Sequence, residues 1–175
     1  MRIEQVIFSN IVANEDYARK TIPFLHSEYF TIPSDKTLYE IIDSYIKDYN
    51  AMPTKEVLHL ELGNRSGLSE DQFKQARELI DALDYSGTGQ DQQWLVDHTE
   101  KFCQDKALYN AVMQAIQIID NKASNISKGS IPQILTDALA VSFDSSIGHD
   151  FLMMLTLDMS FIIARRLRFL LTLSY

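Results

Sequence analysis

The stretch "DQQWLVDHTEKFCQDKALYNAVMQAIQIIDN" (residues 91–121) has the apolar spacing of one long α-helix. The apolar side chains that follow its seven-residue repeat are Leu95, Phe102, Tyr109, Val112, Ile116 and Ile119. His98 and Asp105 take intermediate positions in the first half, so the repeat is regular only in the second half. At about 1.5 Å per residue, roughly 30 residues span about 45 Å, which exceeds the width of a small domain.

A second helix is expected to fold back on the first. The segment "NKASNISKGSIP" (121–132) has the composition of a loop, and a helical pattern follows from about Pro132 to Val141. The two helices could be core helices of one bundle, or a protruding hairpin that packs on the hairpin of another copy. The long heptad pattern favours the second interpretation. The predicted interface residues are Leu95, Phe102, Tyr109, Val112, Ile116, Ile119, Ile134, Leu135 and Leu139.

The residues before the long helix also show helical patterns, so the predicted fold class is all-α. Residues expected to begin a helix are Asn14, Ser34, Thr54 and Ser69, the last with Gln72 in a capping-box pattern. Residues expected to end one are Ile22 before Pro23, then Asn50 and Gly63. The predicted organisation is a helical domain (1–84), a linker "DYSGTGQ" (84–90), the hairpin (91–150) and a tail (153–175).

Composition excludes several classes of protein. With only six glycines and four prolines, the chain has too few turn residues for an all-β fold. Its net charge of −8 disfavours a broad nucleic-acid surface, which needs lysine and arginine. A single cysteine, Cys103, rules out an internal disulfide framework and fits a reducing compartment. The N-terminus "MRIEQVIFSN" lacks the apolar core of a signal peptide.

The sequence shows no recognisable catalytic, cofactor-binding or metal-binding motif. None of the glycines opens a phosphate-binding G-x-x-x-x-G-K-[ST] loop, and the four histidines do not have zinc-site spacing. Cys103 is expected to be a buried structural thiol. "HSEYF" (26–30) places a serine near a histidine, but we expect a junction between helices with its aromatic rings turned inward.

Three stretches carry a resemblance to a known family: "HSEYF" (26–30), "WLVDHTEKFCQDKALYNA" (94–111) and "ALAVSFDSSIGHDF" (138–151). They are similar to the amino-terminal part of the DnaB-like replicative helicases of T-even-type phages. "SFDSSIGHD" is the most specific of them. Order and spacing agree with the family over about residues 3–152.

The resemblance implies a helical collar domain followed by a helical hairpin. In the family, hairpins of neighbouring subunits pair, and the collars form the amino-terminal tier of a hexameric ring that meets the primase. The RecA-like motor, which holds ATP, magnesium and the DNA-contacting loops, has no counterpart in this chain. The resemblance therefore implies no cofactor, no enzymatic activity of the chain alone, and no direct contact with nucleic acid. It also implies a location in the cytoplasm of the infected host cell.

The tail "MMLTLDMSFIIARRLRFLLTLSY" (153–175) departs from the family and from the rest of the chain. Residues 1–150 carry 13 basic and 23 acidic side chains, a net charge of −10, whereas the tail carries three arginines and one aspartate. One choice of codons that encodes the tail also encodes, when it is read one base earlier, the peptide DDADARYEFYHRKEAAIPFDLEL. This peptide resembles the polar linker that follows in the family. We therefore expect an out-of-frame product, and a chain truncated before its motor.

The alternative is a small membrane-associating or adaptor protein whose tail is functional. A spanning helix needs about 20 apolar residues, and Arg165, Arg166 and Arg168 would lie within the bilayer at a cost of several kcal/mol. A helix lying on the membrane surface is less costly and stays open as an interpretation.

Overall fold

All regular elements of the described residues are helices. The computed structural model describes residues 2–87, 91–120 and 126–143. The elements, in order, are α1 (Ile3–Ala13), α2 (Glu15–Thr21), η1 (Ile22–Phe24), η2 (Ser27–Tyr29), α3 (Pro33–Tyr49), α4 (Lys55–Asn64), α5 (Glu70–Ala82), α6 (Gln92–Ile119), η3 (Lys128–Ser130) and α7 (Ile131–Leu139). The predicted all-α fold is confirmed. Residues Met1–Val141 form one compact unit. The predicted tail (153–175) and residues 144–150 of the predicted hairpin lie outside the described residues.

Most helices begin where the sequence predicts. The side chain of Asn14 accepts a hydrogen bond from the Tyr17 amide at 3.0 Å and caps α2. Thr54 caps α4. Ser69 and Gln72 form the predicted capping box, in which each side chain bonds the other residue's amide. These short polar side chains satisfy amide groups that have no partner within the helix.

Two predicted helix boundaries in the body are wrong. Helix α3 begins at Pro33 rather than after Ser34, because proline suits the first turn, where an amide would be unpaired. Ser34 consequently lies buried inside the helix. Gly63 is not the last residue of α4, which continues to Asn64. Arg65 is its C-cap, with an extended backbone, and its guanidinium bonds Glu40 of α3.

An aromatic cluster forms the centre of the helical body. The Phe30 ring stacks on Phe8 of α1 at 4.9 Å and on Tyr39 of α3 at 5.0 Å, and it meets Phe102 of α6 at 5.7 Å. Phe30 and Tyr29 are both buried, which confirms the prediction that "HSEYF" turns its aromatic rings inward. One short segment thus joins three helices that are far apart in the sequence.

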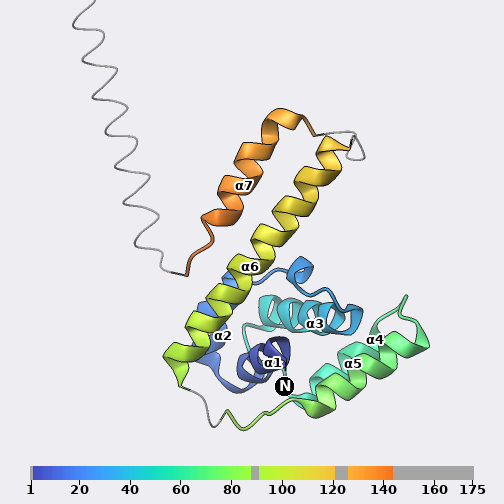
Figure 1. Cartoon of the computed structure of the whole chain (residues 1–175). Coiled ribbons are helices and arrows are strands. Elements are labelled where there is room, and N and C mark those ends of the chain that lie inside the picture. The colour runs from blue at the N-terminus through green and yellow to red at the C-terminus, as the bar shows by residue number, and fades with distance from the viewer. Residues whose placement is uncertain (1, 88–90, 121–125, 144–175) are drawn as a thin grey trace, which may run out of the picture. The chain divides into compact units, whose positions relative to one another are not determined.

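Helix α6 has two halves with different surroundings. Its first half packs against the body, where Leu95, Val96 and Thr99 are buried next to α1 and α2. Its second half extends beyond the body and is accompanied by α7, which folds back along it (Figure 1). With 28 residues, α6 is about 42 Å long. The continuous helix carries the hairpin away from the body without a flexible joint in between.

The predicted linker is held against α1 over its first residues. The Asp84 amide donates a hydrogen bond to the Ser9 hydroxyl at 3.0 Å. Gly87 has φ of +67°, and a Cβ there would come within 3.1 Å of the Ala13 carbonyl oxygen. A larger residue would meet both backbone strain and this close contact. Residues 84–87 are therefore a fitted connection, and residues 88–90 lie outside the described ranges.

The two hairpin helices approach each other through small side chains. Ala107, Ala111 and Ala115 recur every fourth residue along α6 and are buried, as is Ala138 of α7. Side chains four residues apart lie on one helix face, so the alanines form a shallow groove that receives α7. Helix α7 begins one residue earlier and ends two residues sooner than predicted.

A candidate oligomerisation surface on the hairpin

The second half of α6 exposes an apolar stripe. Its six members, with their exposed fractions, are Leu108 (38%), Tyr109 (57%), Val112 (42%), Met113 (41%), Ile116 (46%) and Ile119 (55%). At about 100° per residue they fall within one sector of the helix, beside the sector of the buried alanines. Isolated exposed apolar residues are ordinary, but a stripe of this length marks an interaction surface.

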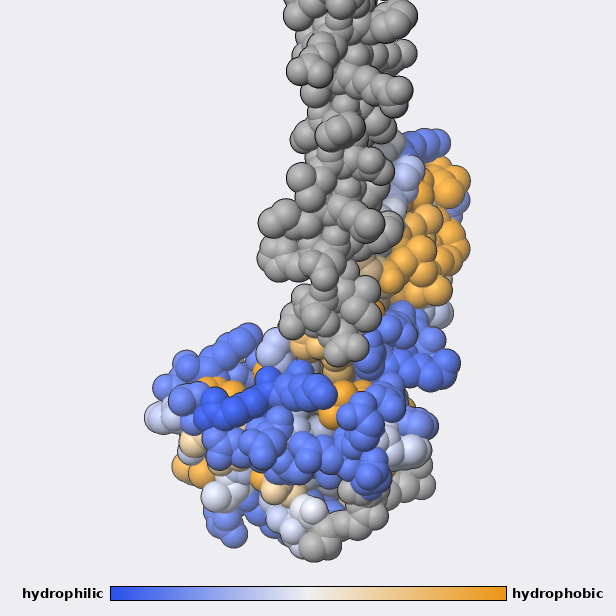
Figure 2. Space-filling view, turned by 90° about the vertical axis from the view of Figure 1, so that its left-hand side faces the viewer, coloured by the Kyte–Doolittle hydropathy of each residue, from blue (hydrophilic) through white to orange (hydrophobic). Residues whose placement is uncertain are grey.

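Helix α7 extends the apolar stripe. Helices α6 and α7 run antiparallel, so successive side chains wind around the two helices in opposite directions when both are followed along the axis of α6. This places Leu135 and Leu139 on the side of α7 that adjoins the stripe. Leu139 is 70% exposed, while Leu135 is half-buried. Figure 2 shows a continuous apolar area over the hairpin, above a body whose surface is mostly polar. The apolar face therefore includes both helices.

The other side of the hairpin carries more polar side chains. A groove of about 780 Å³ lies there, between α6, α7 and η2. Its lining mixes the polar Asn110, Gln114, Gln117 and Asp137 with apolar side chains and reaches Met113 at the edge of the stripe. The hairpin therefore has one continuous apolar face and, on its other side, a groove of mixed character.

Hydrogen bonds fix the hairpin relative to the body. The Asn110 side chain donates to the Glu28 carbonyl of the body at 3.1 Å; within the hairpin, the Gln104 side chain donates to the Val141 carbonyl at 3.0 Å. Deeper in the body, the Tyr17 hydroxyl meets the Thr99 hydroxyl at 2.6 Å, with both side chains buried. Thr99 donates its only hydroxyl hydrogen to the Leu95 carbonyl at 2.7 Å, so Tyr17 is the donor to Thr99.

The nine predicted interface residues fall into three groups. Leu95 and Phe102 lie in the core of the body, where they are 3% and 7% exposed and have no surface to offer a partner. The other α6 members, Tyr109, Val112, Ile116 and Ile119, lie together in the stripe, and Leu139 lies beside it. Ile134 and Leu135 are half-buried along α7.

Sequence reasoning omitted two members of the stripe. Leu108 lies four residues before Val112, and Met113 lies four residues after Tyr109. These spacings place each beside a predicted residue on the same helix face. The four-residue spacing could have predicted both residues, but a strict seven-residue repeat selects fewer helix positions than the exposed sector contains.

The described residues contain no grouping suited to a metal or a nucleophile. No cluster of three histidine, cysteine or acidic side chains is placed to hold a metal ion among them. Cys103 is fully buried, and burial, with a smaller contribution from Glu100, raises the pKa of its thiol from 9.0 to about 12. Because the thiolate is the nucleophile, this supports the prediction of a structural thiol. Within the same residues, no helix is long and apolar enough to cross a bilayer.

Comparison with known proteins identifies the relatives of this chain. No protein-family model matches it. The DnaB-like replicative helicase of Enterobacteria phage T4 is 32% identical to it in an alignment of 156 residues that covers 85% of this chain. This chain is a relative of the DnaB-like replicative helicases. The matched region is 32% of the T4 protein, so the chain spans about a third of that relative's length. The resemblance predicted from three short stretches is confirmed.

Proposed function

We propose that this chain is the self-association module of a DnaB-like replicative helicase, and that it acts by pairing its hairpin with the hairpin of another copy. The exposed apolar stripe of α6 is the observation that carries this proposal. The stripe lies where the heptad pattern is regular and where α6 has left the body. Heptad-spaced apolar side chains on an unaccompanied helix face are suited to a second helix.

A second copy is the partner that the surface fits best. In a two-fold pairing each copy presents the same patch, so one stripe supplies both sides of the interface. The net charge of −10 over residues 1–150 makes nucleic acid an unsuitable partner. No phosphate-binding loop is present in the sequence, so ATP hydrolysis and unwinding would belong to a motor outside these residues.

The relationship to the T4 helicase supplies the wider context of the proposal. We assign the helical body (1–84) to the collar and residues 91–150 to the hairpin of the amino-terminal tier. Paired hairpins would assemble collars into a ring, and this tier would contact the primase in the cytoplasm of an infected host cell. No ATP or magnesium site is assigned to this chain.

Self-association can be tested by sedimentation velocity over a range of concentrations. Ile116 is 46% exposed. Burying the rest of this side chain is worth about 1 kcal/mol, or about 2 kcal/mol when a two-fold interface contains it twice. Replacing it by aspartate removes this contribution and adds a charge. Ile116→Asp should therefore weaken association by at least about 30-fold.

Leu60→Asp provides the matched control, because Leu60 is a 63% exposed aliphatic residue on α4, outside the hairpin. It should leave association unchanged. A wild-type chain that is monomeric at every concentration would refute the proposal. Equal effects of the two substitutions would also refute it. Association that survives Ile116→Asp would refute it too, and would point to the tail as the site of association. Contact with the primase is tested separately, by co-sedimentation with the primase from the same genome.

A further inference from the structure

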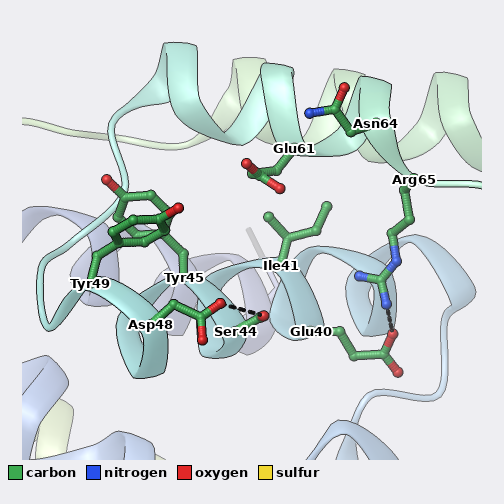
Figure 3. Close-up of a pocket in the computed structure, with 9 residues that line it drawn as sticks. All are labelled: Glu40, Ile41, Ser44, Tyr45, Asp48, Tyr49, Glu61, Asn64 and Arg65. Carbon is green, nitrogen blue, oxygen red and sulfur yellow. Dashed lines mark hydrogen bonds and ion pairs between the residues drawn. The ribbon is translucent and has the colours of Figure 1, made fainter.

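A second surface feature lies on the body, away from the hairpin. A pocket of about 300 Å³ opens between α3 and α4. Figure 3 shows Ile41 at its base, the rings of Tyr45 and Tyr49 at one end, and Arg65 with Glu40 at the other. Its volume is at the low end of the range for ligand sites, which suits a single side chain better than a whole cofactor.

The two tyrosines give the pocket an aromatic wall. Tyr45 and Tyr49 are one turn apart on α3, and their ring centroids lie 4.7 Å from each other at an angle of 36°. Tyr49 is 66% exposed and is the last residue of α3. A ring held by its neighbour and open to solvent presents a face on which a planar cation can stack.

The charges around the pocket are unbalanced. Its lining contains the carboxylates of Glu40, Asp48 and Glu61 but a single cation, Arg65. Arg65 is paired with Glu40 and also donates to the Thr37 carbonyl. Among the described residues, no cation pairs with Glu61 or Asp48. Glu61 reaches from α4 over the pocket, on the side of the tyrosines (Figure 3).

We propose that this pocket binds an arginine side chain of a partner protein. The guanidinium group would stack on the Tyr49 ring and pair with the carboxylate of Glu61. Arginine fits better than lysine, because its planar group can stack on an aromatic face and bond a carboxylate at the same time. The fixed Arg65–Glu40 pair closes the far end of the pocket, so the added cation would occupy the end near the tyrosines.

The proposal is independent of hairpin pairing, because α3 and α4 belong to the body. It can be tested on the full chain by NMR titration of ¹⁵N-labelled protein with the peptide acetyl-Gly-Arg-Gly-amide. A matched peptide with citrulline keeps the shape of the side chain and removes its charge. The arginine peptide should shift the amides of Tyr45, Tyr49 and Glu61, and the citrulline peptide should not.

Two variants assign the binding to the pocket. Glu61→Gln and Tyr49→Ala should each weaken binding of the arginine peptide by about two- to fivefold, the size of an exposed ion pair or cation–π contact. Glu78→Gln, an exposed glutamate on α5, is the control and should have no effect. The variants alter exposed or half-exposed side chains, and the amide spectrum reports whether each still folds.

Several results would overturn the proposal. They are an absence of shifts at the highest peptide concentration, equal shifts with the citrulline peptide, and equal weakening by Glu78→Gln. A lysine peptide that binds as tightly as the arginine peptide would overturn the choice of a guanidinium. None of these results bears on the association of the hairpins.

Discussion

The buried contact between Tyr17 and Thr99 allows a sharp test of how α6 is fixed to the body. Both side chains are buried, and Tyr17 donates to Thr99 while Thr99 donates to the Leu95 carbonyl. The two partners are therefore not equivalent. Removing the donor leaves Thr99 with its bond to the Leu95 carbonyl, whereas removing the acceptor leaves the buried tyrosine hydroxyl with only the Thr21 side chain beside it.

This asymmetry predicts the order of two substitutions. Tyr17→Phe should lower the free energy of unfolding by about 1 kcal/mol, the net value of a hydrogen bond. Thr99→Val keeps the shape and the helix propensity of the side chain but removes the Thr99 acceptor from the buried Tyr17 hydroxyl, at a cost of about 1–3 kcal/mol. For a chain of this size, each kcal/mol lowers Tm by about 2–4 °C.

The double variant provides the internal check. With both hydroxyl groups removed, no buried donor is left unpaired, so the loss should be smaller than the sum of the two single losses by about 1 kcal/mol. Urea unfolding followed by circular dichroism measures all three variants. Thr136→Val is the control, because Thr136 of α7 makes the same backbone contact on an exposed surface and should change stability by less than about 0.5 kcal/mol.

The result that would refute this reasoning is a larger loss from Tyr17→Phe than from Thr99→Val. Strict additivity of the two losses would also contradict it, since it would mean that the two hydroxyl groups do not interact in the folded chain.

Three further predictions concern charge and the tail. Burial raises the pKa of Tyr17 from 10.0 to about 12 and that of Cys103 from 9.0 to about 12. At high pH both groups therefore stay neutral in the folded chain but ionise in the unfolded chain. The stability that they contribute is present below about pH 9 and is lost as the pH rises toward 12, and urea unfolding at pH 8, 9.5 and 10.5 measures this loss. Asp35→Ala should cost about 1.5–3 kcal/mol in urea unfolding, because the nearly inaccessible Asp35 carboxylate accepts two bonds from Arg2, and an unchanged midpoint would contradict this. Resequencing the gene across codons 145–175 should reveal one extra base near codon 152 and an open frame leading to a G-x-x-x-x-G-K-[ST] loop; unchanged bases with no such loop would remove the out-of-frame proposal for residues 153–175.

Local patterns in the sequence determined the helical class and most helix starts. Asn14 and Ser69 cap helices as predicted, because a capping side chain bonds an amide two or three residues away and needs no distant partner. The length of α6 was also predictable, since its periodicity continues without a breaker.

Tertiary structure decided which side of each pattern faces solvent. The same heptad repeat buries Phe102 and exposes Ile116, because α6 crosses the body at one and has left it at the other. The pairing of Arg65, the residue after α4, with Glu40 of α3 is likewise a contact between residues distant in the sequence. Periodicity defines a helix face from neighbours in the chain, whereas burial depends on what the remainder of the chain places against that face. The sequence therefore determined the stripe, and only the packing of the body showed which half of it is open to a partner.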